Sequence, residues 1–220
     1  MWRDPQLVIF DCDGVLVDSE VISNRVLAGM LTAEGLPTTL AQARRDYQGL
    51  LLADVISRAE EKLGRALPQD WLARYEAERT TAFHRELEPV AGAAETVPRI
   101  AAAGVKVCVA SQGKLSKTSL SLELTGLDHL FPETARFSAY SVAHGKPAPD
   151  LFLHAAAAMG AEPAGCVVVE DTPSGVTAAS SAGMRGMGYA ADSDERALRN
   201  AGAAEILRSL DELPRLLGLD

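Results

Sequence analysis

The 220-residue sequence is poor in cysteine, in long apolar runs and in basic residues. No apolar stretch approaches the ~18 residues that a membrane-spanning helix needs, and residues 1–6 show no signal-peptide pattern. The three cysteines, Cys12, Cys108 and Cys166, form no CxxC pair and lie in or beside apolar runs. We therefore expect buried, reduced thiols and a cytoplasmic location.

The charge balance is acidic: 30 aspartates and glutamates outnumber 21 lysines and arginines, which gives a formal net charge of −9. This sign argues against nucleic acid or an anionic membrane as the main partner. We expect a monomer that acts on a small molecule. Apolar residues make up 47% of the chain, enough for a substantial core, and the length allows one large domain or one domain with an insertion.

Strand-like and helix-like segments alternate over most of the chain. Short apolar runs bounded by turn residues, typical of buried parallel strands, occupy residues 7–10, 105–110, 136–140, 166–170, 184–189 and 204–207. Helical patterns occupy residues 93–103, 115–124, 150–159, 174–182 and 210–217. The alternation predicts an α/β fold with a doubly wound parallel sheet and right-handed crossovers.

Residues 19–87 are the exception, because only helical spacing occurs there. Ser19 is expected to cap the first helix, and further helices are expected at residues 40–47, 53–63 and 70–86. An all-helical block this long, directly after a first strand, indicates an insertion into an α/β domain. We therefore predict a core domain formed by residues 1–18 and 88–220 and a helical domain formed by residues 19–87.

Two carboxylates, Asp11 and Asp13, follow the first predicted strand, and Gly14 comes next. Ligands of open α/β sheets collect at the carboxyl ends of strands, and a spacing of two points both side chains the same way. Facing carboxylates repel each other, so a cation or a proton is expected between them, and hard oxygen ligands suit Mg²⁺. The alternative is a helix cap at Asp11 followed by a turn at Asp13-Gly14.

Polar residues also follow later predicted elements. Ser111 comes after the second strand, Lys146 lies in a proline-containing loop, and Glu170 and Asp171 stand at the end of the strand at 166–170. Taken singly, each has a plain alternative: an N-cap, a loop lysine and a simple helix start. Their position in one ordered set favours a shared site.

In order and spacing these residues resemble the four motifs of the haloacid dehalogenase superfamily, from residue 7 to about residue 188. The helical block resembles the small cap of its phosphoglucomutase-like branch. The opening FDCDGVLVDSE is similar to that of bacterial sugar-phosphate phosphatases of this branch. The resemblance implies a Rossmann-like core with an inserted α-helical cap, Mg²⁺ as cofactor and a small phosphorylated metabolite as substrate.

The resemblance also implies roles for the carboxylates. Asp11 would be the nucleophile that forms an aspartyl-phosphate, and Asp13 would be the general acid and then the base. Asp11 and Asp171, with the main-chain carbonyl of Asp13, would hold Mg²⁺, and Glu170 would act on the metal directly or through a water. Because Asp11 must be ionised to attack, we expect Mg²⁺ and Lys146 to lower its pKa, whereas Asp13 needs a raised pKa.

The remaining matches concern the phosphate group. Ser111, helped by the backbone N–H groups of Gln112 and Gly113 at a helix N-terminus, would bind phosphate oxygens. Lys146 would neutralise both the phosphate and Asp11.

The match is poorest in the cap. Sugar phosphomutases of this branch carry a histidine where this chain has Ser23, and an arginine after a hinge glycine that matches Gly49, where this chain has leucines. Gly49, Arg79 and His144 are weaker candidates for contacts with the substrate. Lys114 and Lys117, just beyond Ser111, are candidates for the mouth of the site, but we favour a surface position for both.

We predict a Mg²⁺-dependent phosphatase that acts on a sugar or sugar-acid phosphate through an aspartyl-phosphate. The first alternative is a sugar phosphomutase, against which the absent cap histidine and arginine count. The second is a non-catalytic phosphometabolite-binding protein, which would be expected to have lost a catalytic residue. A dehalogenase lacks the second acid of the first motif and needs no metal, so Asp13 argues against it.

Overall fold

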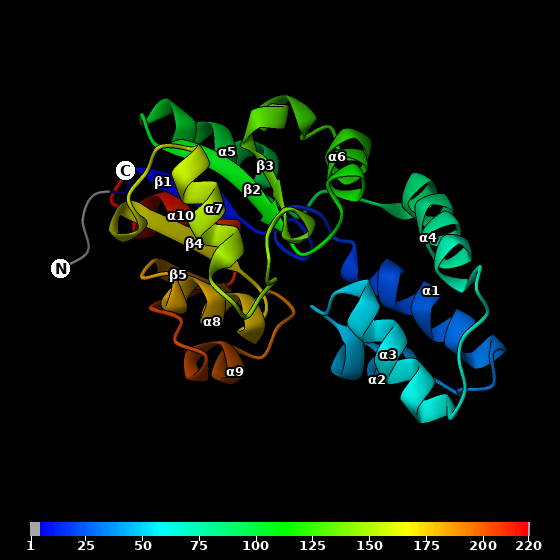
Figure 1. Ribbon diagram of the computed structural model, residues 1–220. Helices are drawn as coiled ribbons and strands as arrows, with labels where there is room; N and C mark the ends of the chain where they lie inside the picture. The colour runs from blue at the N-terminus through cyan, green and yellow to red at the C-terminus, as the bar shows by residue number, and fades with distance from the viewer. Residues whose placement is uncertain (1–4, 220) are drawn as a thin grey trace. The chain divides into compact units, whose positions relative to one another are not determined.

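The computed structural model describes residues 5–219 (Figure 1). The chain separates into two compact units: one contains the chain up to Val17 and from Pro89 onward, and the other is Asp18–Glu88. Residues 1–4, on which the expected absence of a signal peptide partly rests, and residue 220 lie outside the described residues. Within residues 5–219, no helix is both long and apolar enough to cross a membrane.

The first unit contains a six-stranded sheet in the order β3-β2-β1-β4-β5-β6, and every neighbouring pair is parallel. The strands are β1 (Leu7–Phe10), β2 (Lys106–Ser111), β3 (Arg136–Ser138), β4 (Cys166–Glu170), β5 (Arg185–Tyr189) and β6 (Glu205–Leu207). Every residue of β1 and β4 is buried, as continuous apolar runs covered on both faces require. The predicted doubly wound α/β fold is confirmed.

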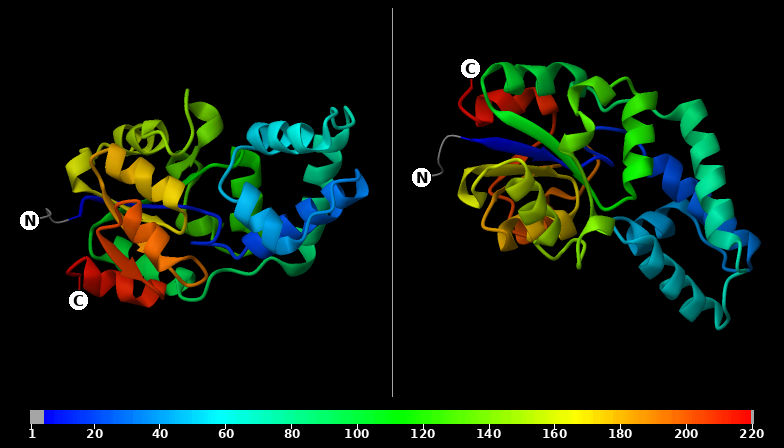
Figure 2. Two further views of the ribbon diagram at one scale, coloured as in Figure 1. Left: turned by 90° about the horizontal axis from the view of Figure 1, so that it is seen from below. Right: turned by 45° about the horizontal axis from the view of Figure 1, so that its top comes forward.

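Helices cover both faces of this sheet. In chain order they are α5 (Ala93–Ala102), α6 (Leu115–Leu124), α7 (Asp150–Ala158), α8 (Pro173–Ser181), α9 (Glu195–Asn200) and α10 (Leu213–Leu216). Helices α5 and α10 lie against one face, and α7 and α8 lie against the other (Figures 1 and 2). Right-handed crossovers would give this arrangement, because the chain moves outward from β1 through β2 to β3 and then returns across the sheet to β4.

Three elements of the core differ from the sequence prediction. Strand β3 ends at Ser138 rather than at residue 140, because Ser138 Oγ accepts a hydrogen bond from Tyr140 N over 3.1 Å and a 3₁₀ turn follows. The predicted helix at 210–217 begins as a 3₁₀ turn, Leu210–Glu212, before α10. Helix α9 has no counterpart in the prediction; Asp194 caps this short helix by accepting two backbone N–H groups.

The register of the sheet aligns the carboxyl ends of its central strands. Phe10 of β1 pairs with Val109 of β2 on one side and with Val169 of β4 on the other. Asp11 N then donates a hydrogen bond to Val169 O over 3.0 Å, so the chain leaves β1 beside the end of β4. The polar residues that follow these strands therefore start from one edge of the sheet.

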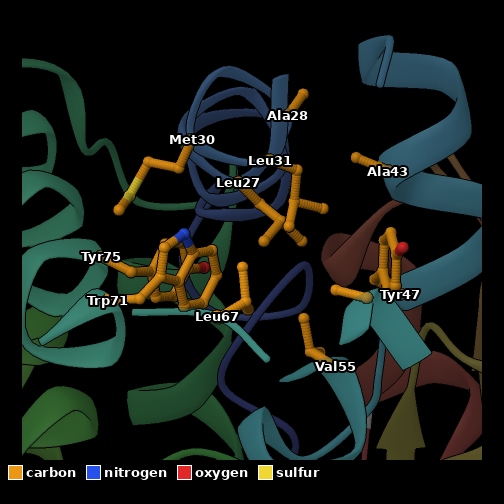
Figure 3. Packing of buried hydrophobic residues seen from close by; sticks show 11 residues of the cluster. Leu27, Ala28, Met30, Leu31, Ala43, Tyr47, Val55, Leu67, Trp71 and Tyr75 are labelled. Atoms are coloured by element: carbon orange, nitrogen blue, oxygen red, sulfur yellow. The ribbon is translucent and has the colours of Figure 1, made fainter. Parts of the chain in front are cut away.

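The second unit, described by itself, is built from helices. They are α1 (Glu20–Ala33), α2 (Leu40–Tyr47), α3 (Leu52–Leu63) and α4 (Trp71–Glu86). Buried side chains from all of these helices form one apolar cluster (Figure 3). Within it the rings of Trp71 and Tyr75 stack, with centroids 5.7 Å apart and an interplanar angle of 3°. These aromatic residues therefore form part of the core of the unit.

The starts of two helices in this unit use different capping chemistry. Ser19 stands at the N-cap position of α1, but its side chain makes no capping hydrogen bond, so the predicted cap is wrong in this respect. At the start of α2, Thr39 and Gln42 form a reciprocal capping box.

The two connections between the units run side by side. Val17 forms an isolated antiparallel bridge with Pro89. The next pair along is joined by a hydrogen bond of 3.0 Å from Asp18 N to Glu88 O. The chain therefore leaves the core at Val17 and re-enters it at Pro89, two residues that lie side by side although they are far apart in the sequence.

Candidate active site

Buried polar side chains gather where the central strands of the first unit end. Ser111, the last residue of β2, has no exposed surface, and Glu170, the last residue of β4, is 1% exposed. Asp11, directly after β1, is 6% exposed. Burial of such groups is costly unless they are paired or hydrogen-bonded, so their partners define the site.

The ammonium group of Lys146 joins two of these carboxylates. Lys146 Nζ lies 2.5 Å from Asp11 Oδ1 and 2.5 Å from Glu170 Oε1, and it donates a further hydrogen bond to Ala110 O over 3.3 Å. The side chains of the three charged residues are 3%, 8% and 1% exposed for Lys146, Asp11 and Glu170 respectively. The predicted contact between Lys146 and Asp11 is therefore present in the structure.

Burial and neighbouring charges shift the pKa values of Lys146 and Asp11. Burial disfavours the charged form of Lys146, but the adjacent Asp11 and Glu170 carboxylates outweigh this effect and raise the pKa of the lysine. Burial raises the pKa of Asp11 to about 7, the Glu170 and Asp13 carboxylates act in the same direction, and Lys146 opposes them. Lys146 alone therefore does not outweigh burial, and the lowering of the Asp11 pKa by Mg²⁺ together with Lys146 stays a prediction. One ammonium cannot fully compensate two buried carboxylates.

Both oxygens of Glu170 have donors. Oε1 accepts a hydrogen bond from Lys146 Nζ. Oε2 accepts hydrogen bonds from Thr172 N over 2.9 Å and from Thr172 Oγ1 over 2.8 Å. The carboxylate packs directly on Gly175 of α8, where a Cβ atom would overlap it. Glu170 thus holds Lys146 in place, and this arrangement differs from the direct metal ligation that the resemblance allows.

The carboxylate of Asp13 is held from two sides. Ser111 Oγ donates a hydrogen bond to Asp13 Oδ2 over 3.4 Å, and Lys117 Nζ forms an ion pair with Asp13 Oδ1. Ser111 Oγ in turn accepts a hydrogen bond from Gly113 N over 3.0 Å. The structure therefore brings Ser111, Gly113 and Asp13 together, and Lys117 joins them although a surface position was favoured for it.

Lys117 was expected at the surface, and this expectation is wrong: its side chain is 9% exposed. The reason lies in where α6 begins. The helix starts at Leu115 with Lys114 at its N-cap position, so Ser111 belongs to the strand and is not a helix cap. Side chains in the first turn of a helix lean back toward its N-terminus, which directs Lys117 toward the end of β2.

The side chain of Gln112 also has a role that the sequence did not indicate. Its Oε1 accepts a hydrogen bond from Lys146 N over 3.0 Å, and its Nε2 donates one to Lys146 O over 3.3 Å. The amide lies against Gly145, where a Cβ atom would come within 2.8 Å of Nε2. Gln112 therefore ties the loop after β2 to the main chain of Lys146.

Asp171 lies against the loop that carries the first two aspartates. Gly14 has a φ of +76°, and a Cβ atom there would come within 2.9 Å of Asp171 Cγ. Only glycine combines this left-handed conformation with such close approach. The Asp171 carboxylate can therefore lie directly beside the backbone of the Asp11–Gly14 loop.

The charges of the site are unbalanced. Two lysines, Lys117 and Lys146, contact the carboxylates of a site that contains Asp11, Asp13, Glu170 and Asp171. Hard oxygens in excess over cations suit a divalent cation such as Mg²⁺. Within residues 5–219, no group of three His, Cys, Asp or Glu side chains could hold a metal alone.

The weaker candidates lie elsewhere. His144 has a 75% exposed side chain and pairs with Asp150 Oδ1 over 3.1 Å at the start of α7, so it belongs to a surface contact. Gly49, with a φ of +75°, follows α2 in the helical unit. Arg79 belongs to the same unit, where its guanidinium lies 5.1 Å from the Tyr75 ring centroid.

Comparisons with known proteins agree with this geometry. A family model described as haloacid dehalogenase-like hydrolase matches residues 5–183. The chain belongs to this family. It is 33% identical over 188 residues to 6-phosphogluconate phosphatase of Escherichia coli K12, covering 85% of this chain and 83% of that protein. It is 29% identical over 208 residues to hexitol phosphatase B of the same organism, covering 93% and 92% of the two chains.

A solved structure of a family hydrolase shares the fold along its whole length. A haloacid dehalogenase family hydrolase from Deinococcus radiodurans, with bound phosphate and sodium, has a TM-score of 0.80 and 32% identity to this chain. The match covers 98% of this chain and 97% of that one. The family and the fold class predicted from the sequence are confirmed.

The packing of Glu170 on Gly175 gives a prediction about stability. Gly175→Ala places a methyl group into the carboxylate, so we expect a loss of about 1–3 kcal/mol in the free energy of unfolding, as for other overpacked sites. Gly29→Ala is the matched control: Gly29 is also helical, but nothing lies within 4 Å of a Cβ atom there. It should gain up to ~1 kcal/mol. Urea unfolding measures both, and equal effects would contradict the proposed packing constraint.

The raised pKa of Asp11 gives a prediction about pH. Since folding raises this pKa from 3.8 to about 7, the folded state binds the proton more tightly, so stability falls as the pH rises from 3.8 to about 7 and changes little above that. In chelator, Asp11→Asn should unfold at a higher temperature than the wild type at pH 8. The difference should grow from pH 5 to pH 7 and then level off. Asp192→Asn, at an exposed position, should show no such trend, and an Asp11→Asn variant no more stable than wild type at pH 8 would contradict the argument.

Proposed function

We propose that this protein is a Mg²⁺-dependent phosphatase that hydrolyses a sugar or sugar-acid phosphate through a phosphoryl group carried on Asp11. The contact that carries the proposal is the buried Lys146 ammonium, 2.5 Å from Asp11 Oδ1. It holds a carboxylate at the end of the central strand, next to Ser111 and Asp13. This is the arrangement that a carboxylate nucleophile for an anionic substrate requires.

In the first step, an Asp11 carboxylate oxygen would form a bond to phosphorus while the bond from phosphorus to the ester oxygen breaks. Lys146 orients Asp11 through Oδ1 and supplies positive charge to the phosphoryl oxygens. Ser111 Oγ, which accepts a hydrogen bond from Gly113 N, would turn its single proton from Asp13 to another of these oxygens when the substrate binds. Splitting the displacement into two steps avoids direct attack of water on a dianion.

Asp13 would serve both steps. It would give its proton to the departing ester oxygen and then take one from the water that releases phosphate from Asp11. The hydrogen bond from Ser111 Oγ to Asp13 Oδ2 places this carboxylate within the site.

Mg²⁺ would be held by Asp11, Asp171 and the main-chain carbonyl of Asp13. When bound, it would reduce the repulsion between the carboxylates and an incoming phosphate and stabilise charge on the phosphoryl oxygens. The close approach of Asp171 to Gly14 supports this ligand set. Glu170 acts on Lys146 through the contact described above.

The substrate class rests on the relatives. One is named a 6-phosphogluconate phosphatase and another a hexitol phosphatase, and both cover most of this chain. A solved family hydrolase at 32% identity carries bound phosphate. Water is the proposed acceptor because Ser23 and Leu50–Leu52 stand where a phosphomutase would carry a histidine and an arginine.

Single-turnover kinetics with two variants tests the proposed function. Asp11→Asn should abolish release of alcohol from every phosphate ester. Asp13→Asn should slow the first step by about 10²–10⁴-fold for an alkyl phosphate and much less for an aryl phosphate, whose leaving group needs little protonation. His144→Gln, a change outside the site, is the control and should keep the wild-type rates. Equal slowing of alkyl and aryl esters by Asp13→Asn would contradict its role as general acid.

Metal dependence is tested separately on the wild-type protein. Excess chelator should abolish phosphate release from a sugar-phosphate panel, and added Mg²⁺ should restore it, whereas Zn²⁺ should not, because the donors are hard oxygens. Colorimetric detection of phosphate provides the measurement. Full activity in excess chelator would contradict the proposed cofactor.

A further inference from the structure

Lys117 is a buried lysine that neither the family motifs nor the proposed chemistry assigns. Its side chain is 9% exposed, and its ammonium forms an ion pair with Asp13 Oδ1. The neighbouring glycine makes room for it: a Cβ atom at Gly113 would come within 3.3 Å of Lys117 Cδ and 3.4 Å of Ser111 Oγ. The absence of a side chain at Gly113, in the loop between β2 and α6, therefore leaves space for the aliphatic part of Lys117.

Burying the Lys117 side chain costs free energy that a position at the surface would not. An ammonium group loses hydration when it is buried, and its long stem loses rotamer freedom. A charge-assisted contact with a carboxylate offsets this cost and has a narrower geometry than a contact between neutral groups. The ion pair therefore fixes the position of the Asp13 carboxylate as much as that of the lysine.

The two oxygens of Asp13 have separate partners. Oδ1 is held by Lys117, and Oδ2 accepts a hydrogen bond from Ser111 over 3.4 Å. Asp11, by contrast, is held by Lys146 over 2.5 Å. Each aspartate thus has its own lysine, and the Lys117 contact lies on the acid–base residue, not on the nucleophile.

We propose that Lys117 is a positioning residue: it holds the Asp13 carboxylate in the orientation from which Asp13 serves the leaving oxygen and the attacking water. This inference rests on the proposed function for the role of Asp13, and it adds a residue outside the four motifs. Lys117 acts through Asp13 and does not itself bind the transferred phosphate.

Lys117→Met tests the proposal because methionine keeps most of the length and apolar surface of the stem while removing the charge. The rate of the first step with an alkyl phosphate should fall by ~10–100-fold, which is less than the ~10²–10⁴-fold expected when a general acid is removed altogether. The rate with an aryl phosphate should fall by less than ~3-fold. The KM and the inhibition constant of inorganic phosphate should stay within ~3-fold of wild type. Lys117→Arg, which keeps a cation, should recover most of the alkyl rate.

Lys106→Met is the matched control. Lys106 is the first residue of β2, the strand that ends at Ser111. It therefore lies at the edge of the sheet opposite the site, where its Nζ donates a hydrogen bond to Met159 O over 2.8 Å. It should change neither the alkyl nor the aryl rate. Equal slowing of both esters by Lys117→Met would indicate a merely structural role and overturn the proposal. A tenfold or larger rise in the inhibition constant of phosphate would make Lys117 a phosphate ligand and overturn it too.

Crystal structures of the wild type and Lys117→Met separate this inference from the proposed function. The Asp13 carboxylate should move or occupy two rotamers in the variant, whether or not the wild type hydrolyses any phosphate ester. An Asp13 side chain in the same rotamer in both structures would overturn the positioning role. Failure of the wild type to hydrolyse every ester in the panel would instead overturn the proposed function.

Discussion

The buried ammonium of Lys146 is the contact on which the site depends. It lies between Asp11 and Glu170, and all three side chains are withdrawn from water. In such a setting an unpaired charge costs several kcal/mol, so loss of Lys146 would leave two buried carboxylates without their cation. The surroundings restrain the trio further: Gln112 holds the main chain of Lys146, and Gly175 leaves room for the Glu170 carboxylate.

The topology of the sheet explains why these side chains meet. The chain builds β1, then β2 and β3 on one side, and then crosses to β4 on the other side of β1. Neighbouring strands whose connections depart to opposite faces leave a crevice at their carboxyl ends. Asp11 stands at the end of β1, between Ser111 of β2 and Glu170 of β4, because the register places the three strand ends level.

The sequence predicted most of the fold and the membership of the site, because both depend on local patterns. Buried runs such as Cys166–Glu170 are recognisable from composition, and the polar residues that follow them mark the strand ends. The partners of Lys117 and Gln112 could not be predicted, since they depend on where α6 begins and on how two loops approach each other. The pKa of Asp11 was also beyond prediction, because burial and neighbouring carboxylates arise only in the folded chain.

The paired connections at Val17–Pro89 and Asp18–Glu88 make the helical unit a replaceable module. Opposed residues of an antiparallel pair lie only about 4.5–5.5 Å apart, so a short turn could close the core in place of the whole insertion. Insertions of different length and composition would then leave the strand register, and the chemistry built on it, unchanged. The helical unit can therefore change in evolution independently of the strand ends on which the site is built.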